Sequence, residues 1–341
     1  MVGPFISDAI TNHLPNGASH LVTSRDDRPL VFLIQLQPPS FISHLKMSTT
    51  AEMLSRTVTL PNGLTTPQIH LGLYMLSPSA TYSTVYSALK LGYRGFDSAQ
   101  WYSNEKETGQ AILDFLASGP SSDDNASGIK REDIFYTTKL KDNSQNYDAV
   151  KSQIDKSVKR CGLGYVDLFL LHSPLGGEKA RKVSWKALVD AQREGKIKNV
   201  GVSNYGVKHL QEFEKRQEKV VPAVNQIEVH PFNTQVQIRE KCREMGIQVQ
   251  AYAPLARGMR FGRGESKKLA EVAKKYGCTE AQVMVRWSLQ KGFVTLPKSS
   301  QEKRMKENAD VGWFELEEGD LEVLDGLDEG LVTDWDPTDA P

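Results

Sequence analysis

The sequence predicts an α/β fold: a single (β/α)8 TIM barrel that is entered through an N-terminal β-hairpin and preceded by a non-barrel N-terminal extension. Short apolar runs alternate with longer segments of helical period from Arg56 onward. The runs number eight, and the turn Pro61-Asn62-Gly63 before them supplies the positive φ angles of a tight hairpin. Eight strands separated by covering helices favour a closed parallel barrel over an open sheet.

The first 55 residues differ in composition from the rest. They combine Pro, Ser and Asn with one short apolar run, Leu30–Leu36, and no helical period persists. The first basic residue is Arg25, so the basic start of a secretory or mitochondrial leader is missing. We therefore expect residues 1–55 to be a poorly ordered extension and residues 56–341 to be the barrel domain. Met47 is an alternative translation start, which leaves open whether the residues before it belong to the mature protein.

The elements of the barrel follow in chain order. The hairpin pairs Thr57–Leu60 with Leu64–Thr66. Amphipathic segments such as Tyr147–Arg160, Ser184–Arg193 and Glu265–Lys275 are long enough to form covering helices. The predicted strands are Ile69–Leu73, Tyr93–Phe96, Ile134–Thr138, Val166–Leu171, Val200–Val202, Ala223–Ile227, Gln248–Ala253 and Val294–Leu296.

Composition narrows the class of partner. Lys and Arg total 42 residues and Asp and Glu total 42, so the net charge is zero and no basic field attracts a nucleic acid. The 3 cysteines are widely separated, which indicates neither a disulfide framework nor a metal clip. The longest apolar run, Leu30–Ile34, is far shorter than the ~20 residues of a membrane span. We expect a cytoplasmic monomer with a small-molecule substrate, no metal, no nucleic acid and no membrane.

Polar residues follow the predicted strands, where the active site of such a barrel lies. Taken singly, each has a structural interpretation: Asp97 as a helix cap, Tyr102 as a half-buried aromatic residue and His172 as a core histidine. Lys139 ends a buried strand and needs a charged partner. Four ionisable groups at one barrel mouth together predict a catalytic site. The polar residues at the remaining strand ends are Ser203, Asn204, Gln226, Tyr252 and Lys298.

These four side chains suit one kind of proton transfer. A tyrosine phenol has a reference pKa of about 10 and is a slow acid at neutral pH. We expect Lys139 to lower the pKa of Tyr102 and Asp97 to hold the lysine in place. His172 would donate a hydrogen bond to a carbonyl oxygen. Such a group protonates an alkoxide, which implies that a hydride arrives at the carbonyl carbon.

The hydride requires a cofactor, because no side chain supplies one. No G-x-G-x-x-G motif follows a strand, so a Rossmann domain is not supported. Tyr147 and Lys151 have the Y-x-x-x-K spacing of short-chain dehydrogenases, but without that glycine-rich loop we interpret them as a helix surface. Lys298, Ser299 and Arg304, after the last strand, are suited to holding a phosphate, and a solvated basic helix start is the alternative.

The segment Gly92–Glu105 (GYRGFDSAQWYSNE) resembles the signature of the aldo-keto reductase family. The resemblance covers about residues 56–341. It is closest to compact microbial and fungal members, similar to the diketogluconate-reductase-like ones. Departures at Tyr74, Lys141 and Ser173 leave the four catalytic positions intact. The matching segments further along the chain are Thr138–Leu140, Leu171–Pro174, Gly201–Tyr205, Asn225–Pro231 and Tyr252–Leu255.

The resemblance implies a (β/α)8 barrel that reduces an aldehyde or ketone with NADPH. It implies that Asp97, Tyr102, Lys139 and His172 are catalytic. It places Tyr252 against the nicotinamide, Ser203, Asn204 and Gln226 at its carboxamide, and Leu255 in the same site. It places Lys298, Ser299 and Arg304 at the 2′-phosphate, and Glu307 and Asn308 at the adenine. The expected walls of the substrate pocket are Tyr74, Trp101, His172 and Trp335. The alternative is an NADP(H)-binding barrel that acts as a sensor or as a regulatory or structural subunit.

Overall fold

The computed structural model describes residues 48–119, 124–125, 127–215, 220–262 and 266–341. In this part of the chain, eight strands form one sheet in which each strand runs parallel to its neighbours in chain order. The strands are β3 (His70–Gly72), β4 (Gly95–Asp97), β5 (Phe135–Leu140), β6 (Val166–Leu171), β7 (Ile197–Ser203), β8 (Val224–Glu228), β9 (Gln248–Tyr252) and β10 (Val294–Leu296). All eight predicted strands are present.

The first and last strands meet and close the sheet into a barrel. A parallel bridge joins Ile69 to Thr295, and the Thr295 amide donates to the Gln68 carbonyl at 2.9 Å. The Gly72 amide donates to the Pro297 carbonyl at 3.1 Å. Closure matters for function because it brings the carboxyl ends of all eight strands around one opening.

The predicted hairpin covers the opposite end of the barrel. It consists of β1 (Thr57–Thr59) and β2 (Thr65–Pro67), which pair antiparallel. Leu60 in its turn region is 2% exposed and belongs to an interior cluster with Phe135, Leu168, Leu170, Ala223 and Val224. Asn62 donates to Asn199 Oδ1 at 2.7 Å. The hairpin therefore fills the barrel from the amino ends of its strands.

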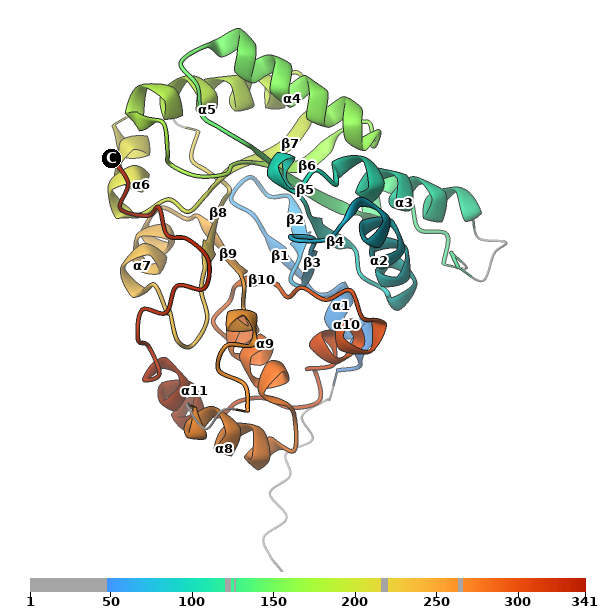
Figure 1. The fold of residues 1–341 in the computed structure, drawn as a ribbon, viewed down its shortest axis with the longest axis vertical. Coiled ribbons are helices and arrows are strands. Elements are labelled where there is room, and N and C mark those ends of the chain that lie inside the picture. Colours follow the sequence, from blue (N-terminus) through green and yellow to red (C-terminus); the bar gives the residue numbers. More distant parts are fainter. Residues whose placement is uncertain (1–47, 120–123, 126, 216–219, 263–265) are drawn as a thin grey trace, which may run out of the picture. The chain divides into compact units, whose positions relative to one another are not determined.

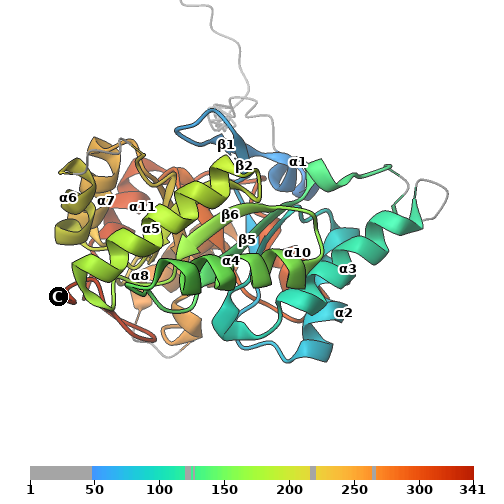
Figure 2. The same ribbon diagram turned by 90° about the horizontal axis from the view of Figure 1, so that it is seen from above.

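Helices surround the strands, as Figures 1 and 2 show. Their buried faces contribute Phe115, Trp185 and Trp287 to the main core, which lies between helices and strands. No helix in the described residues is long and apolar enough to cross a membrane. The helices after the hairpin are α2 (Pro78–Leu91), α3 (Glu105–Ser118), α4 (Tyr147–Cys161), α5 (Gly177–Arg193), α6 (Val207–Glu214), α7 (Val236–Glu244), α8 (Lys267–Tyr276), α9 (Glu280–Gln290), α10 (Glu302–Ala309) and α11 (Glu318–Asp325).

A further helix, α1 (Thr50–Ser55), lies within the range that the sequence assigned to the extension. Thr49 and Glu52 form a capping box at its start, and Met53 is completely buried in the main core. Thr50 donates to Asp310 Oδ1 at 2.9 Å, beside the end of α10 (Figure 1). Residues 50–55 are thus part of the compact unit that contains the barrel. Residues 1–47 of the predicted extension lie outside the described residues.

Gly109 tests how closely α3 and α4 are packed. A Cβ at this position would lie 1.7 Å from the carbonyl oxygen of Cys161, where α4 ends. Gly109→Ala should therefore lower the free energy of unfolding by about 3 kcal/mol, because helix backbones must separate. Gly319→Ala in α11 is the control, since nothing lies within 4 Å of its Cβ. The control should be neutral or stabilise by up to about 1 kcal/mol. Urea denaturation measures both, and equal effects would contradict the prediction.

Candidate active site

Three ionisable side chains meet where β4 and β5 end. Asp97 is the last residue of β4, Lys139 lies near the end of β5, and Tyr102 ends the 3₁₀ turn Gln100–Tyr102. The Lys139 ammonium donates to Asp97 Oδ1 at 2.5 Å, to the Ser98 carbonyl at 2.9 Å and to the Tyr102 hydroxyl oxygen at 3.2 Å. The lysine is completely buried, so these three acceptors replace its hydration.

Burial determines the direction in which the pKa values of Lys139 and Tyr102 shift. It lowers the pKa of Lys139 below its usual value, against the opposing attraction of Asp97. It also raises the pKa of Tyr102 well above its usual value, and the negative charge of Asp97 acts in the same direction. The net shift of the Tyr102 pKa is thus upward, opposite to the lowering expected from Lys139, because desolvation of the phenolate is the largest cause. At neutral pH the tyrosine therefore keeps its proton.

His172 follows β6 directly, and its ring contacts that of Tyr102. The two ring centroids lie 5.8 Å apart. Burial, together with the nearby Lys139 charge, holds the pKa of His172 well below its usual value, so the imidazole is neutral. Its Nδ1 atom is buried without a partner among the described residues. A neutral imidazole can donate one hydrogen bond and accept one.

The side-chain amides of Gln226 and Asn204 connect Asp97 and His172 to the other polar residues at the barrel mouth. Gln226 donates to Asp97 Oδ2 at 2.8 Å, and its backbone carbonyl accepts from Ser203 Oγ at 2.9 Å. Asn204 donates to the His172 carbonyl at 3.1 Å and accepts from the Tyr252 hydroxyl at 3.0 Å. Asn204 has φ 61°, the left-handed conformation that asparagine tolerates better than most residues. These bonds fix the side chains that the sequence assigned to one site.

A cleft of about 910 Å³ opens above these residues. Lys139 does not line it, because the lysine is completely buried. Ser299 does not line it either. The Ser299 hydroxyl accepts from the Gln301 amide at 3.0 Å, where α10 begins. The predicted site residues that do line the cleft are Asp97, Tyr102, His172, Ser203, Asn204, Gln226, Tyr252, Leu255, Lys298, Arg304, Glu307, Asn308, Tyr74, Trp101 and Trp335.

The two ends of the cleft differ chemically. At one end, Lys298 and Arg304 are exposed, and neither forms an ion pair with a residue in the described part of the chain. At the other end, the Trp101 ring centroid lies 4.9 Å from that of His172 and 5.6 Å from that of Trp335. The Tyr74 ring lies 5.0 Å from Tyr102. The cleft therefore joins a cationic region to an aromatic region across the buried lysine group.

The sequence analysis missed several residues of the site. Arg257 lines the cleft in the loop after β9, pairs with Asp334 at 2.7 Å and lies over the Tyr74 ring at 5.3 Å. Its position after a strand is a signal that could have found it. Gln250 lies inside β9 and contacts Gln226, and its signal is a glutamine within an apolar strand.

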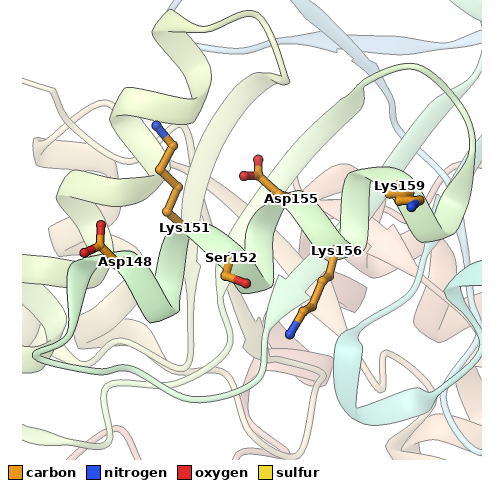
Figure 3. Close-up of a pocket in the computed structure, with 6 residues that line it drawn as sticks. All are labelled: Asp148, Lys151, Ser152, Asp155, Lys156 and Lys159. Atoms are coloured by element: carbon orange, nitrogen blue, oxygen red, sulfur yellow. The ribbon is translucent and has the colours of Figure 1, made fainter.

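The Y-x-x-x-K spacing lies far from this cleft, on α4. The Tyr147 hydroxyl donates to Asp190 at 2.8 Å, and Lys151 pairs with Glu194 at 2.6 Å, at the end of α5. Figure 3 shows Lys151 in a shallow depression lined only by α4 side chains. The two residues thus connect neighbouring helices, in agreement with the interpretation as a helix surface.

Comparison with known proteins places this chain among oxidoreductases. Residues 68–329 match the model of the aldo/keto reductase family. An uncharacterized oxidoreductase of Schizosaccharomyces pombe is 48% identical over 289 residues, which cover 85% of this chain and 100% of that protein. Glyoxal reductase of Bacillus subtilis is 38% identical, over 80% of this chain and 93% of the enzyme. An aldo-keto reductase of Bombyx mori, solved in complex with NADP, has a TM-score of 0.74 and 28% identity, over 83% and 95% of the two chains.

The buried ion pair predicts a stability pattern. Asp97→Asn leaves the Lys139 ammonium without its counter-charge and should lower the free energy of unfolding by about 3–5 kcal/mol. Lys139→Met alone leaves a buried carboxylate and should also destabilise. The double variant removes both charges, so its loss in free energy of unfolding should be smaller than the sum of the two single losses. Chemical denaturation of the four proteins measures this, and strictly additive losses would contradict a direct pair.

Proposed function

Because the chain belongs to the aldo/keto reductase family, we propose that it is an NADPH-dependent oxidoreductase that reduces an aldehyde or ketone to an alcohol. The observation that carries the proposal is the hydrogen-bonded chain Asp97–Lys139–Tyr102 beside the cleft. A protonated phenol next to a buried ammonium is suited to giving a proton to a strong base such as an alkoxide. The Bacillus relative is a glyoxal reductase and the Bombyx relative binds NADP, and both support the proposal.

The residues around the cleft fit a phosphorylated dinucleotide. Lys298 and Arg304 are unpaired among the described residues, and guanidinium and ammonium groups are the usual partners of a phosphate. Ser203, Asn204 and Gln226 offer hydrogen bonds for a carboxamide, and the Tyr252 ring offers a flat face. When bound, NADPH supplies the hydride that the carbonyl carbon receives. Glu307 and Asn308, on α10, would contact the adenine.

Tyr102 is the proposed proton donor. Lys139 donates to the phenol oxygen, so the phenol O–H itself stays available to a substrate oxygen in the cleft. The high pKa of the phenol keeps its proton in place until negative charge develops on that oxygen. The Lys139 ammonium then stabilises the phenolate that remains, and Asp97 keeps the ammonium aimed at it.

His172 and the aromatic end of the cleft orient the substrate. The neutral imidazole lies beside Tyr102 and can donate to the same carbonyl oxygen. Tyr74, Trp101 and Trp335 would contact the rest of the substrate. With a substrate bound between them, their rings would limit the access of water to the reacting oxygen, which strengthens the electrostatic interactions around it.

We also propose that the protein acts as a monomer in the cytoplasm. All three cysteines, Cys161, Cys242 and Cys278, are free, which supports a reducing compartment.

Replacement of the proton donor tests the mechanism. Tyr102→Phe should lower kcat for carbonyl reduction by about 10²- to 10⁴-fold, because no other group donates the proton. The dissociation constant of NADPH should change little. Tyr82→Phe removes a phenol from the surface of α2 and serves as the control. NADPH absorbance follows turnover with a panel of aldehydes, ketones and keto-sugars. Undiminished turnover by Tyr102→Phe would refute the mechanism, and NADPH binding without turnover on any substrate would favour the sensor alternative.

The cationic end of the cleft should set cofactor preference. Replacing Lys298 and Arg304 together by Ala should reduce the kcat/KM ratio of NADPH over NADH by about 10- to 100-fold, since two charge-assisted phosphate contacts are lost. Lys306→Ala on the same helix does not touch the cleft and is the matched control. Steady-state kinetics with both cofactors measure the ratio. A ratio that stays constant in the double variant would show that these cations do not hold the phosphate.

A further inference from the structure

Two glutamines lie side by side inside the barrel. Gln226 on β8 and Gln250 on β9 are direct neighbours in the register of the sheet, and both are buried. Gln226 Nε2 donates to Asp97 Oδ2 at 2.8 Å and to Gln250 Oε1 at 3.0 Å. A primary amide carries two N–H donors. Both donors of Gln226 are therefore used by protein acceptors.

The remaining polar atom of this amide is its carbonyl oxygen. No residue in the described part of the chain donates to Gln226 Oε1, and Gln226 lines the cleft. Asp97 already carries the Lys139 bond, so a Gln226 amide turned by 180° would bring its oxygen against a carboxylate. Asp97 alone, however, engages only one of the two N–H groups. The acceptor of Gln250 is what keeps the second N–H away from the cleft.

A glutamine at position 250 is expected to destabilise the folded protein. Its side chain is completely buried, and its Nε2 atom has no hydrogen-bond partner among the described residues. A buried donor without a partner destabilises a protein, whereas an apolar side chain of similar size has no such donor. What Gln250 contributes is thus its carbonyl oxygen, which accepts from Gln226.

We propose that Gln250 is a positioning residue that makes Gln226 present only an acceptor to the cleft, so that the site selects a cofactor whose carboxamide donates an N–H. The inference rests on the proposed NADPH-dependent function. Gln250 does not contact the cofactor. It acts through Gln226, and the same Gln226 nitrogen also holds Asp97, so cofactor recognition and the Asp97–Lys139 pair share one side chain.

The test compares NADP⁺ with its 3-acetylpyridine analogue, in which a methyl group replaces the carboxamide nitrogen. Isothermal titration calorimetry gives both dissociation constants without turnover. Wild-type protein should bind NADP⁺ about 3- to 10-fold more tightly than the analogue, the effect of one hydrogen bond. In Gln250→Met the second Gln226 N–H is released and can meet the acetyl oxygen. The ratio should therefore fall towards one.

Two variants control the measurement. Gln250→Glu keeps an acceptor in either protonation state and should restore the wild-type ratio. Gln248→Leu removes an amide from the other end of β9, where it bonds to Val249 and Gly292, and should also keep that ratio. If Gln250→Met does not fold by circular dichroism, Gln250→Leu replaces it.

The outcomes separate the two proposals. A wild-type ratio in folded Gln250→Met or Gln250→Leu, or a ratio near one in the wild-type protein, overturns the role of Gln250 and leaves the proposed function standing. A failure of Gln250→Glu to restore the ratio also overturns it. Absence of NADP⁺ binding by the wild-type protein refutes the proposed function and this inference together.

Discussion

The rest of the site depends on one buried ion pair, between Asp97 and Lys139. An ammonium with no exposure to water is tolerated only where acceptors surround it, and here a carboxylate, a carbonyl and a phenol do so. Asp97 is in turn held by Gln226 on β8, whereas Asp97 lies on β4. In a closed barrel of eight strands β4 and β8 face each other, so the hydrogen bond between Gln226 and Asp97 joins opposite walls of the barrel.

Because the site residues come from different strands, the site requires a closed barrel. The group draws on three strands: Asp97 and Tyr102 come from the end of β4, Lys139 from β5 and Gln226 from β8. The short bridges between Ile69 and Thr295 and between Gly72 and Pro297 complete the ring. The hairpin fills the opposite end with Leu60. Residues outside the catalytic group therefore help to hold the strands that carry it.

Much of this arrangement could be predicted from the sequence. The eight strands were visible as apolar runs, and strand-end positions indicated Asp97, Lys139 and His172, because parallel strands carry their carboxyl ends to one edge. The helix α1 was missed since its six residues show no sustained period. The net rise of the Tyr102 pKa was not predicted, because burial depends on how elements pack, which no local pattern records. Arg257 and Gln250 occupy positions that the sequence marks, after a strand and within one. The partners that give them a role, Asp334 and Gln226, lie elsewhere in the chain.

The packing of α1 against the barrel domain matters for the design of shortened forms of the protein. Ser48 and Thr50 bond to Gly312 and Asp310, just beyond the end of α10. Arg304 lies on that same helix. A polypeptide that started at the hairpin would lack these hydrogen bonds. Their loss would affect the position of α10 and, with it, the cationic end of the cleft. Fusion partners and affinity tags are therefore best attached ahead of Ser48, with α1 kept whole.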